Sequence, residues 1–273
     1  MGEIKAGHDI STQNGRYLVL PPYVDGQELY YNLSLPDISV PDSIQQYPIG
    51  TKYADGLNVY RYCAFKATMN NNLGAKNGNR QAVAYATIAA AAAQYATTLV
   101  VDVGASDGNG EDGAIDADEL AGGTILIFDA TGPVYLRTIK SNTATTGAAE
   151  MTVEVIDPIP AALIADTDHA ELMANIYSYV NTTNERPVIG VPLLNYTSGQ
   201  YGWVQTWGIS WLAPQTAVGV GSNNLLCVFR HDGSIDELDY NDAYNNKGVI
   251  AGYVVNRSDA TQSAPFIMLQ LAP

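Results

Sequence analysis

The sequence predicts a mostly β protein, in which an extended N-terminal arm precedes antiparallel β-sandwich or barrel-type domains with little helix. Short runs rich in β-branched residues recur from residue 98 onward, and glycine, proline or asparagine bounds each run. Five of the 13 prolines lie within the first 50 residues. We therefore expect an arm over 1–50, a β-rich domain over 51–185, and a small C-terminal β-barrel or sandwich over 186–273.

The arm is predicted from its prolines and its apolar side chains. Proline removes a backbone donor and disfavours helix at the preceding residue, so this stretch is expected to run extended across a surface. It is too short to build a large core, so its apolar side chains are expected to be buried on a partner surface, either that of a larger assembly or that of a neighbouring subunit. The interface candidates of the arm are Tyr17, Leu18, Leu20, Tyr23, Tyr30 and Tyr31.

The second domain begins with an alanine-rich segment at 81–97 that permits two interpretations. Alanine has the highest helix propensity, which favours a helix. Two strands of small residues around a turn fit equally well. Further on, a helical turn or two is expected at 161–166 or 168–175. Four strands are expected at 98–103, 124–128, 134–139 and 151–156.

The third domain repeats the pattern of short strands separated by turn residues. A linker near 181–187, with the sequence N-T-T-N-E-R-P, is expected to precede it. Short strands joined by glycine-containing turns, without a long helix, favour a small barrel or sandwich. The expected strands are 188–194, 201–207, 209–212, 225–229, 249–255 and 265–271.

The charge of the chain argues against nucleic acid as a partner. Its formal net charge is −15, and few basic side chains are present to neutralise phosphates. Residues 1–80 hold seven basic and seven acidic side chains, whereas 81–273 hold six and 21. The N-terminal part is therefore expected to face different surroundings from the acidic remainder. No apolar run is long enough to predict a membrane span, and none predicts a secretion signal.

An acidic loop at 107–119 resembles two kinds of binding site. Residues 108–113, G-N-G-E-D-G, match a dinucleotide-binding pattern, but six carboxylates within 13 residues would repel a pyrophosphate. Calcium is a weak alternative, because position 6 of the loop lacks the glycine that the sharp turn of such a site requires. The expectation is a solvated loop tip without a metal. The weak calcium candidates are Asp107, Asn109, Glu111 and Asp118.

Groups suited to catalysis are sparse, so neither an enzyme nor a cofactor is expected. The three histidines lie far apart in the sequence and form no metal-binding pair. Asp168-His169 and His231-Asp232 are local carboxylate–imidazole neighbours, which are ordinary in loops. Cys63 and Cys227 are too few for a disulfide framework and are expected to be small buried hydrophobes.

All three tryptophans lie within residues 199–211, G-Q-Y-G-W-V-Q-T-W-G-I-S-W. On a strand, the side chains of Tyr201, Trp203 and Trp207 share one face. This aromatic stripe is interpreted either as the core of the C-terminal domain or, together with Trp211, as a contact with another subunit or a capsid.

Several stretches resemble a family of tailed-bacteriophage proteins that decorate the capsid, also called cement or head auxiliary proteins. The similarity covers about residues 45–273, and its most specific motif is Y-G-W-V-Q-T-W-G. The other motifs are Y-P-I-G-T (47–51), V-Y-R-Y-C (59–63), A-G-G-T-I-L-I-F (121–128), V-Y-L-R-T-I (134–139), D-P-I (157–159), V-I-G-V-P (188–192), G-V-I-A-G-Y-V (248–254) and F-I-M-L-Q-L-A-P (266–273).

The resemblance implies a homotrimer on the outer surface of a virion capsid, where it binds the major capsid protein and stabilises the shell without catalysis. It also implies synthesis in the cytoplasm of a host bacterium, with no nucleic acid or membrane as a partner. A structural component of the tail or baseplate is one alternative. A carbohydrate-binding adhesin is another, because tryptophan and tyrosine rings stack on sugar faces.

Overall fold

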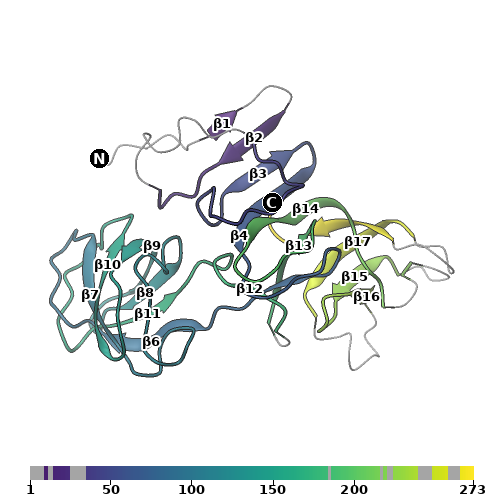
Figure 1. The fold of residues 1–273 in the computed structure, drawn as a ribbon. Coiled ribbons are helices and arrows are strands. Elements are labelled where there is room, and N and C mark those ends of the chain that lie inside the picture. The colour runs from purple at the N-terminus through teal and green to yellow at the C-terminus, as the bar shows by residue number, and fades with distance from the viewer. Residues whose placement is uncertain are drawn as a thin grey trace. The chain divides into compact units, whose positions relative to one another are not determined.

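The computed structural model describes residues 9–11, 15–24, 35–183, 186–215, 218–219, 224–238, 248–257 and 265–273 (Figure 1). Every regular element among these residues is a β-strand. All pairings between these strands are antiparallel, and they form two sheets. The predicted fold class, mostly β with antiparallel sheets and little helix, is confirmed.

The chain forms two compact units. The large unit combines residues 1–20, 31–78 and 179–273, and the inserted unit combines 21–30 and 79–178. The sequence predicted that 51–78 belongs to the same domain as the residues that follow, up to 185. In the structure these residues belong with the C-terminal strands, because the strand at 58–64 pairs with the strand at 201–211.

The sheet of the large unit contains twelve strands. Nine of them lie in the order β1-β2-β3-β4-β14-β18-β17-β15-β16, while β5, β12 and β13 pair off this path. The bounds are β1 Asp9–Ser11, β2 Arg16–Val19, β3 Lys52–Asp55, β4 Asn58–Ala64, β5 Ala75–Asn77, β12 Val180–Asn181, β13 Val188–Pro192, β14 Tyr201–Trp211, β15 Leu226–Phe229, β16 Ile235–Glu237, β17 Ile250–Asn256 and β18 Phe266–Gln270.

Strand β14 lies in the middle of this sheet. It pairs with β4 from Tyr201 to Trp207 and with β18 from Trp207 to Trp211. The register with β4 shifts between Gln205 and Trp207, which is a β-bulge at Thr206. The two strands predicted at 201–207 and 209–212 are therefore one continuous strand.

Part of the predicted arm belongs to the large sheet. Strand β2 pairs with β3, and Leu18 lies opposite Tyr53. Both Leu18 and Leu20 are buried within the chain. The expectation that Leu18 and Leu20 are buried on a partner is therefore wrong, because both are buried within the chain, where β2 is a strand of the large sheet.

The inserted unit is a curled six-stranded sheet with the order β6-β11-β8-β9-β10-β7. Beyond β6, Ile88 forms a bridge with Val101 of β7, and the Ala89 N–H donates to the Val100 carbonyl at 2.8 Å. The sheet thus curls until its two edge strands meet. The bounds are β6 Gln81–Thr87, β7 Thr98–Val103, β8 Thr124–Phe128, β9 Val134–Asn142, β10 Ala149–Val155 and β11 His169–Met173.

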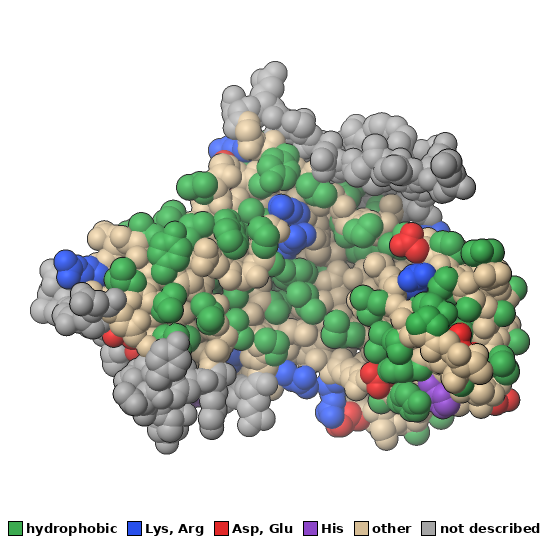
Figure 2. Space-filling model, turned by 180° about the vertical axis from the view of Figure 1, so that it is seen from behind, with side chains coloured by type: hydrophobic (Ala, Val, Ile, Leu, Met, Phe, Trp, Pro, Cys, Tyr) green, Lys and Arg blue, Asp and Glu red, His purple; other side chains and the backbone are tan. Residues whose placement is uncertain are grey.

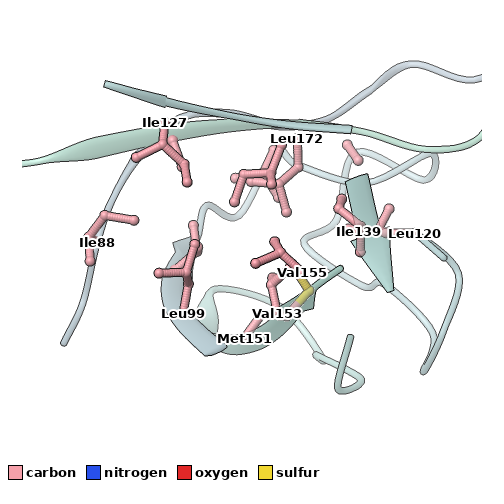
Figure 3. Close-up of a cluster of buried hydrophobic side chains, with 14 of the residues drawn as sticks. Ile88, Leu99, Leu120, Ile127, Ile139, Met151, Val153, Val155 and Leu172 are labelled. Atoms are coloured by element: carbon pink, nitrogen blue, oxygen red, sulfur yellow. The ribbon is translucent and has the colours of Figure 1, made fainter. Parts of the chain in front are cut away.

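A single hydrophobic core fills the inside of the curled sheet (Figure 3). On β7 and β10, buried side chains alternate with more exposed ones, which is the period-two pattern of a strand with one buried face. Side chains from all six strands and from the connecting loops form this core. Those labelled in Figure 3 are Ile88, Leu99, Leu120, Ile127, Ile139, Met151, Val153, Val155 and Leu172.

The alanine-rich segment is a strand only in its first half. Residues 81–87 form β6, after which Ile88 and Ala92 form isolated bridges with Val101 and Leu163. The expected helical turn at 168–175 is wrong, because 169–173 forms β11. Ala170 and Leu172 point into the core while His169 and Glu171 are only half-buried, a period of two that a helix cannot produce.

We predict that Ile139→Ala destabilises the protein by about 2–5 kcal/mol, because it leaves a cavity in this core. Chemical denaturation would measure the loss of unfolding free energy. The control is Ile164→Ala, since Ile164 is exposed and should change stability little. Equal effects of the two substitutions would contradict this account of the core.

Candidate interaction surfaces

Trp203 belongs to the core of the large unit. Its ring contacts the rings of Tyr47, Tyr53 and Tyr62, with centroid distances of 5.3, 5.9 and 5.1 Å. Trp203 is 1% exposed. For this residue the core interpretation of the aromatic stripe holds, because almost no surface is left for a partner.

Residues 41–50 cover the aromatic core. The backbone of Asp42 exchanges two hydrogen bonds with that of Tyr201, at 2.9 and 2.8 Å. The Tyr62 hydroxyl donates to the Asp42 carboxylate at 2.6 Å and accepts from the Gln46 N–H at 3.1 Å. Burial, and then the Asp42 carboxylate, raise the pKa of Tyr62 far above its usual value. This part of the predicted arm is therefore a fixed cover within the chain.

Tyr196 is hydrogen-bonded to the backbone of β14. Its hydroxyl accepts from the backbone N–H of Trp203 at 3.1 Å, and its ring stacks on Phe65 with centroids 3.9 Å apart. A Cβ atom at Gly202 would lie 2.4 Å from the Tyr196 ring, so only glycine fits there. Burial raises the pKa of Tyr196 to about 12.

Beyond the bulge, one face of β14 becomes exposed. Inward-facing Ser210 and Leu212 are buried, whereas Ile209 and Trp211 are exposed. Apolar side chains are also exposed or half-buried on β18, β17 and β15. We call the resulting surface the outer apolar face; it consists of Trp207, Ile209, Trp211, Leu226, Tyr253, Phe266 and Met268.

Strand pairing makes the outer apolar face continuous. One row crosses four strands, because Ile209 lies opposite Met268, Met268 opposite Tyr253, and Tyr253 opposite Leu226. In a second row Trp211 lies opposite Phe266. These seven residues include no lysine, arginine, histidine, aspartate or glutamate. In Figure 2, hydrophobic side chains recur over the unit that carries these strands, with few charged ones between them.

The inserted unit has a second apolar surface, which the sequence did not indicate. Tyr85, whose backbone has φ 43, stacks on His169 with centroids 4.4 Å apart and meets Phe128 edge-on at 5.2 Å. Val134 lies opposite Phe128, and both Val134 and Leu136 are exposed. We call these five residues the barrel apolar surface. It is flanked by Glu171, which lies opposite Leu126.

The structure separates the interface candidates into three groups. Leu18, Leu20 and Trp203 are buried, so they offer almost no surface to a partner. Tyr30 and Tyr31 lie outside the described residues. The candidates with exposed or partly exposed side chains are Tyr17, Tyr23, Tyr201, Trp207 and Trp211. Of these, the structure places Trp207 and Trp211 together on one surface.

Asp107 in the acidic loop has a structural role. It is buried, and its two carboxylate oxygens accept from the N–H groups of Ala84 at 3.2 Å and Gly104 at 2.8 Å. This carboxylate therefore ties the loop to β6. The expectation of a solvated loop tip holds for exposed Glu111, Asp112, Asp116 and Asp118 and fails for Asp107.

The four calcium candidates do not converge on one point. Asp107 binds backbone N–H groups, Glu111 forms an ion pair with Arg80, and Asn109 donates to Glu119 at 3.1 Å. In the described part of the chain, no three histidine, cysteine or acidic side chains lie together in a way suited to a metal ion. The dinucleotide-like stretch 108–113 is followed by turns and a short bridge rather than a helix, so it has no helix N-terminus for a pyrophosphate.

The local carboxylate–imidazole neighbours build turns. Buried Asp168 accepts from the N–H groups of Ala130 at 2.8 Å and Ile164 at 2.6 Å. Asp232 accepts from the N–H and the hydroxyl of Ser234 at 3.0 and 2.6 Å. These hydrogen bonds account for both carboxylates as structural groups.

Both cysteines are free and buried, which confirms their prediction as small buried hydrophobes. Burial raises the pKa of the Cys63 thiol well above its usual value and that of Cys227 to about 12. At neutral pH both thiols are therefore protonated and poor nucleophiles.

Comparisons with protein-family models, with curated proteins and with solved structures gave no match to this chain. A search of the described residues for a helix long and apolar enough to cross a membrane found none.

We predict that Asp107→Ala lowers the unfolding free energy by about 1–3 kcal/mol, because two backbone N–H groups lose their acceptor. Asp116→Ala is the matched control, since Asp116 is exposed in the same loop. Thermal unfolding should reveal the difference, and a chelator should leave the wild-type melting temperature unchanged. A melting temperature that falls with chelator would instead support a bound cation.

The burial of Tyr196 also predicts how the stability of the protein changes at alkaline pH. Because burial raises the pKa of Tyr196 from 10.0 to about 12, its contribution to stability is complete below pH 10 and is lost as the pH rises towards 12. Tyr196→Phe should therefore lose less stability than wild type over this interval, although it starts less stable. Tyr95→Phe, at an exposed position, should keep the wild-type slope. Denaturant unfolding at several pH values measures the slopes, and equal slopes for all three proteins would refute the assignment.

Proposed function

We propose that the protein is a structural component of a virion, a decoration protein that binds the outside of a tailed-phage capsid and stabilises the shell without catalysis. The observation that carries the proposal is the exposure of apolar side chains, Val40 and Ile44, in the formally neutral N-terminal segment of a chain of net charge −15. Large exposed apolar surfaces mark sites of protein association. The resemblance of several motifs to those of decoration proteins supports a capsid as the assembly that we propose.

The distribution of charge along the sequence favours one segment of the chain as the contact with the shell. Residues 1–80 are formally neutral, whereas 81–273 carry the entire net negative charge. A neutral segment docks on a shell without bringing like charges together, and an acidic body facing outward keeps neighbouring particles apart. In this arrangement the N-terminal segment contributes to the contact with the major capsid protein.

Exposed apolar residues in that segment support this assignment. Ile44 is 71% exposed, although other residues of 41–50 cover the aromatic core. Val40, just before this stretch, is also exposed. Tyr17 is partly exposed, and the Lys52 ammonium lies 6.0 Å from the centre of its ring. These side chains could bury apolar surface on a partner without any rearrangement of the sheet beneath them.

The test adds purified protein to DNA-filled heads that lack it, and measures occupancy and the temperature at which the heads release DNA. Wild-type protein should occupy the heads and raise that temperature. Ile44→Glu should lower occupancy, because it places a charge in the proposed contact. Ile164→Glu, an exposed apolar position in the inserted unit, is the control and should bind normally.

Two outcomes would contradict the proposal. Full-length protein that never binds heads would exclude a decoration role, and a position on the tail in a virion reconstruction would favour the tail or baseplate alternative. Normal occupancy by Ile44→Glu would leave the decoration role intact but move the shell contact away from 41–50.

A further inference from the structure

We propose that the barrel apolar surface, together with Glu171 at its border, binds an arginine side chain that a partner protein presents among apolar residues. This contact is separate from the proposed contact with a capsid, which involves the N-terminal segment, so it can be tested without capsids. Three features support it: an exposed aromatic ring, a carboxylate that the described residues leave unpaired, and the strongly acidic unit around both.

Strand pairing places Glu171 beside the apolar side chains of the surface. Leu136 lies opposite Leu126, and Leu126 lies opposite Glu171, in a row next to that of Val134 and Phe128. Within the described part of the chain, the Glu171 carboxylate takes part in no hydrogen bond or ion pair. An incoming cation therefore displaces no existing partner. Once a partner protein covers the apolar side chains, water no longer screens the new ion pair.

A β-bulge presents the Tyr85 ring on the part of β6 that faces Glu171. Two residues of β6, Ala84 and Tyr85, lie between the partners of Ala170 and Leu172, where β11 has Glu171 alone. The backbone of Tyr85 is left-handed, with φ 43, and its side chain is 57% exposed. A bulky residue seldom adopts this conformation, and a bulge commonly redirects a side chain. The bulge thus holds an aromatic ring in the open beside a carboxylate.

Two contacts hold the bulge and its ring in place. The buried Asp107 carboxylate accepts from the N–H of Ala84 at 3.2 Å. The Tyr85 ring stacks on His169 with centroids 4.4 Å apart, so one face of the ring is covered and the other is left for a ligand. Because the ring is positioned before a ligand arrives, little conformational entropy is lost on binding.

Arginine matches the ring and the carboxylate better than lysine does. A guanidinium is planar, so it stacks on an aromatic ring while its N–H donors form a fork that pairs with a carboxylate. A lysine ammonium is compact and strongly hydrated, and it has no plane to stack. Apolar residues on either side of the arginine would pack on Val134 and Leu136, which are 54% and 63% exposed.

The charge of the inserted unit favours a cationic partner over a neutral one. Residues 79–178 hold 14 acidic and three basic side chains, a formal charge of −11. Two of the basic side chains, Arg80 and Lys140, are paired with Glu111 and Glu154. The negative potential attracts a basic protein from a distance and contributes nothing to the binding of a neutral sugar. An arginine-bearing protein is therefore favoured over a neutral glycan, although sugar rings also stack on tyrosine.

The experiment titrates purified full-length protein with the peptide acetyl-Gly-Leu-Arg-Leu-Gly-amide and measures the dissociation constant by NMR. A matched peptide carries citrulline, which has the shape of arginine without its charge. The arginine peptide should bind, and the citrulline peptide should bind about tenfold more weakly or worse, because it cannot form the charge-assisted pair with Glu171.

Two substitutions test the ring and the carboxylate separately. Glu171→Gln and Tyr85→Ala should each raise the dissociation constant of the arginine peptide by about threefold or more, because one removes the paired charge and the other the stacking ring. Asp116→Asn is the control for charge, since Asp116 is exposed in the acidic loop. Tyr95→Ala is the control for the ring, since Tyr95 is exposed and also left-handed, with φ 68. Both controls should bind as wild type does.

Circular dichroism of each variant would establish that it folds, and if Tyr85→Ala does not fold, Glu171→Gln provides the test from another strand. Three outcomes would overturn the assignment: no binding of the arginine peptide at millimolar concentration, equal binding of the citrulline peptide, or a loss in Asp116→Asn as large as that in Glu171→Gln. The last would show attraction by overall charge alone. Binding of the neutral oligosaccharide maltotriose in place of the arginine peptide would overturn it in favour of a glycan.

Discussion

The pairing of β14 with strands from distant parts of the sequence organises the large unit. Its first half is bound to β4, its second half to β18, and β13 joins through Val191 and Pro192. The first half is buried on both faces, and the rings of Tyr47, Tyr53 and Tyr62 pack on Trp203, whereas the second half, beyond the bulge at Thr206, leaves one face in solvent. One strand therefore carries both a buried tryptophan, Trp203, and an exposed one, Trp211.

This arrangement explains why residues 41–50 are ordered although they lack regular secondary structure. The Asp42 backbone is hydrogen-bonded to the Tyr201 backbone, and the Tyr62 hydroxyl donates to the Asp42 carboxylate. Burial of the Tyr62 phenol, and then the hydrogen bond that it donates to Asp42, raise the pKa of Tyr62. The cover and the aromatic core are consequently one cooperative structure, and neither is expected to persist when the other is removed.

The sequence predicted most of the strands that have a regular alternation or a β-branched run. Residues 98–103 and 124–128 match β7 and β8 to the residue. It did not predict the strand at 169–173, where alanine, glutamate and histidine have weak β propensity and burial in the sheet decides the conformation. Nor could it separate Trp203 from Trp211, because the rings that pack on Trp203 come from Tyr47, Tyr53 and Tyr62, which lie far away in the sequence. The sequence also did not predict the structural role of Asp107, because this role depends on the folded positions of the N–H groups of Ala84 and Gly104.

The main segment of the inserted unit, 79–178, begins and ends at neighbouring points. Val180 of β12 pairs with Asn77 of β5, and the Gly78 N–H donates to the Tyr179 carbonyl at 2.7 Å, so two antiparallel strands form a stem at the base of the insertion. The entropy cost of closing such a stem grows only slowly with the length of the segment between its two strands, by about 0.6 kcal/mol for each doubling. The twelve-stranded sheet therefore depends little on the length of the segment that joins β5 to β12. A protein of this design could gain, lose or exchange that segment while the strands around its tryptophans stay the same.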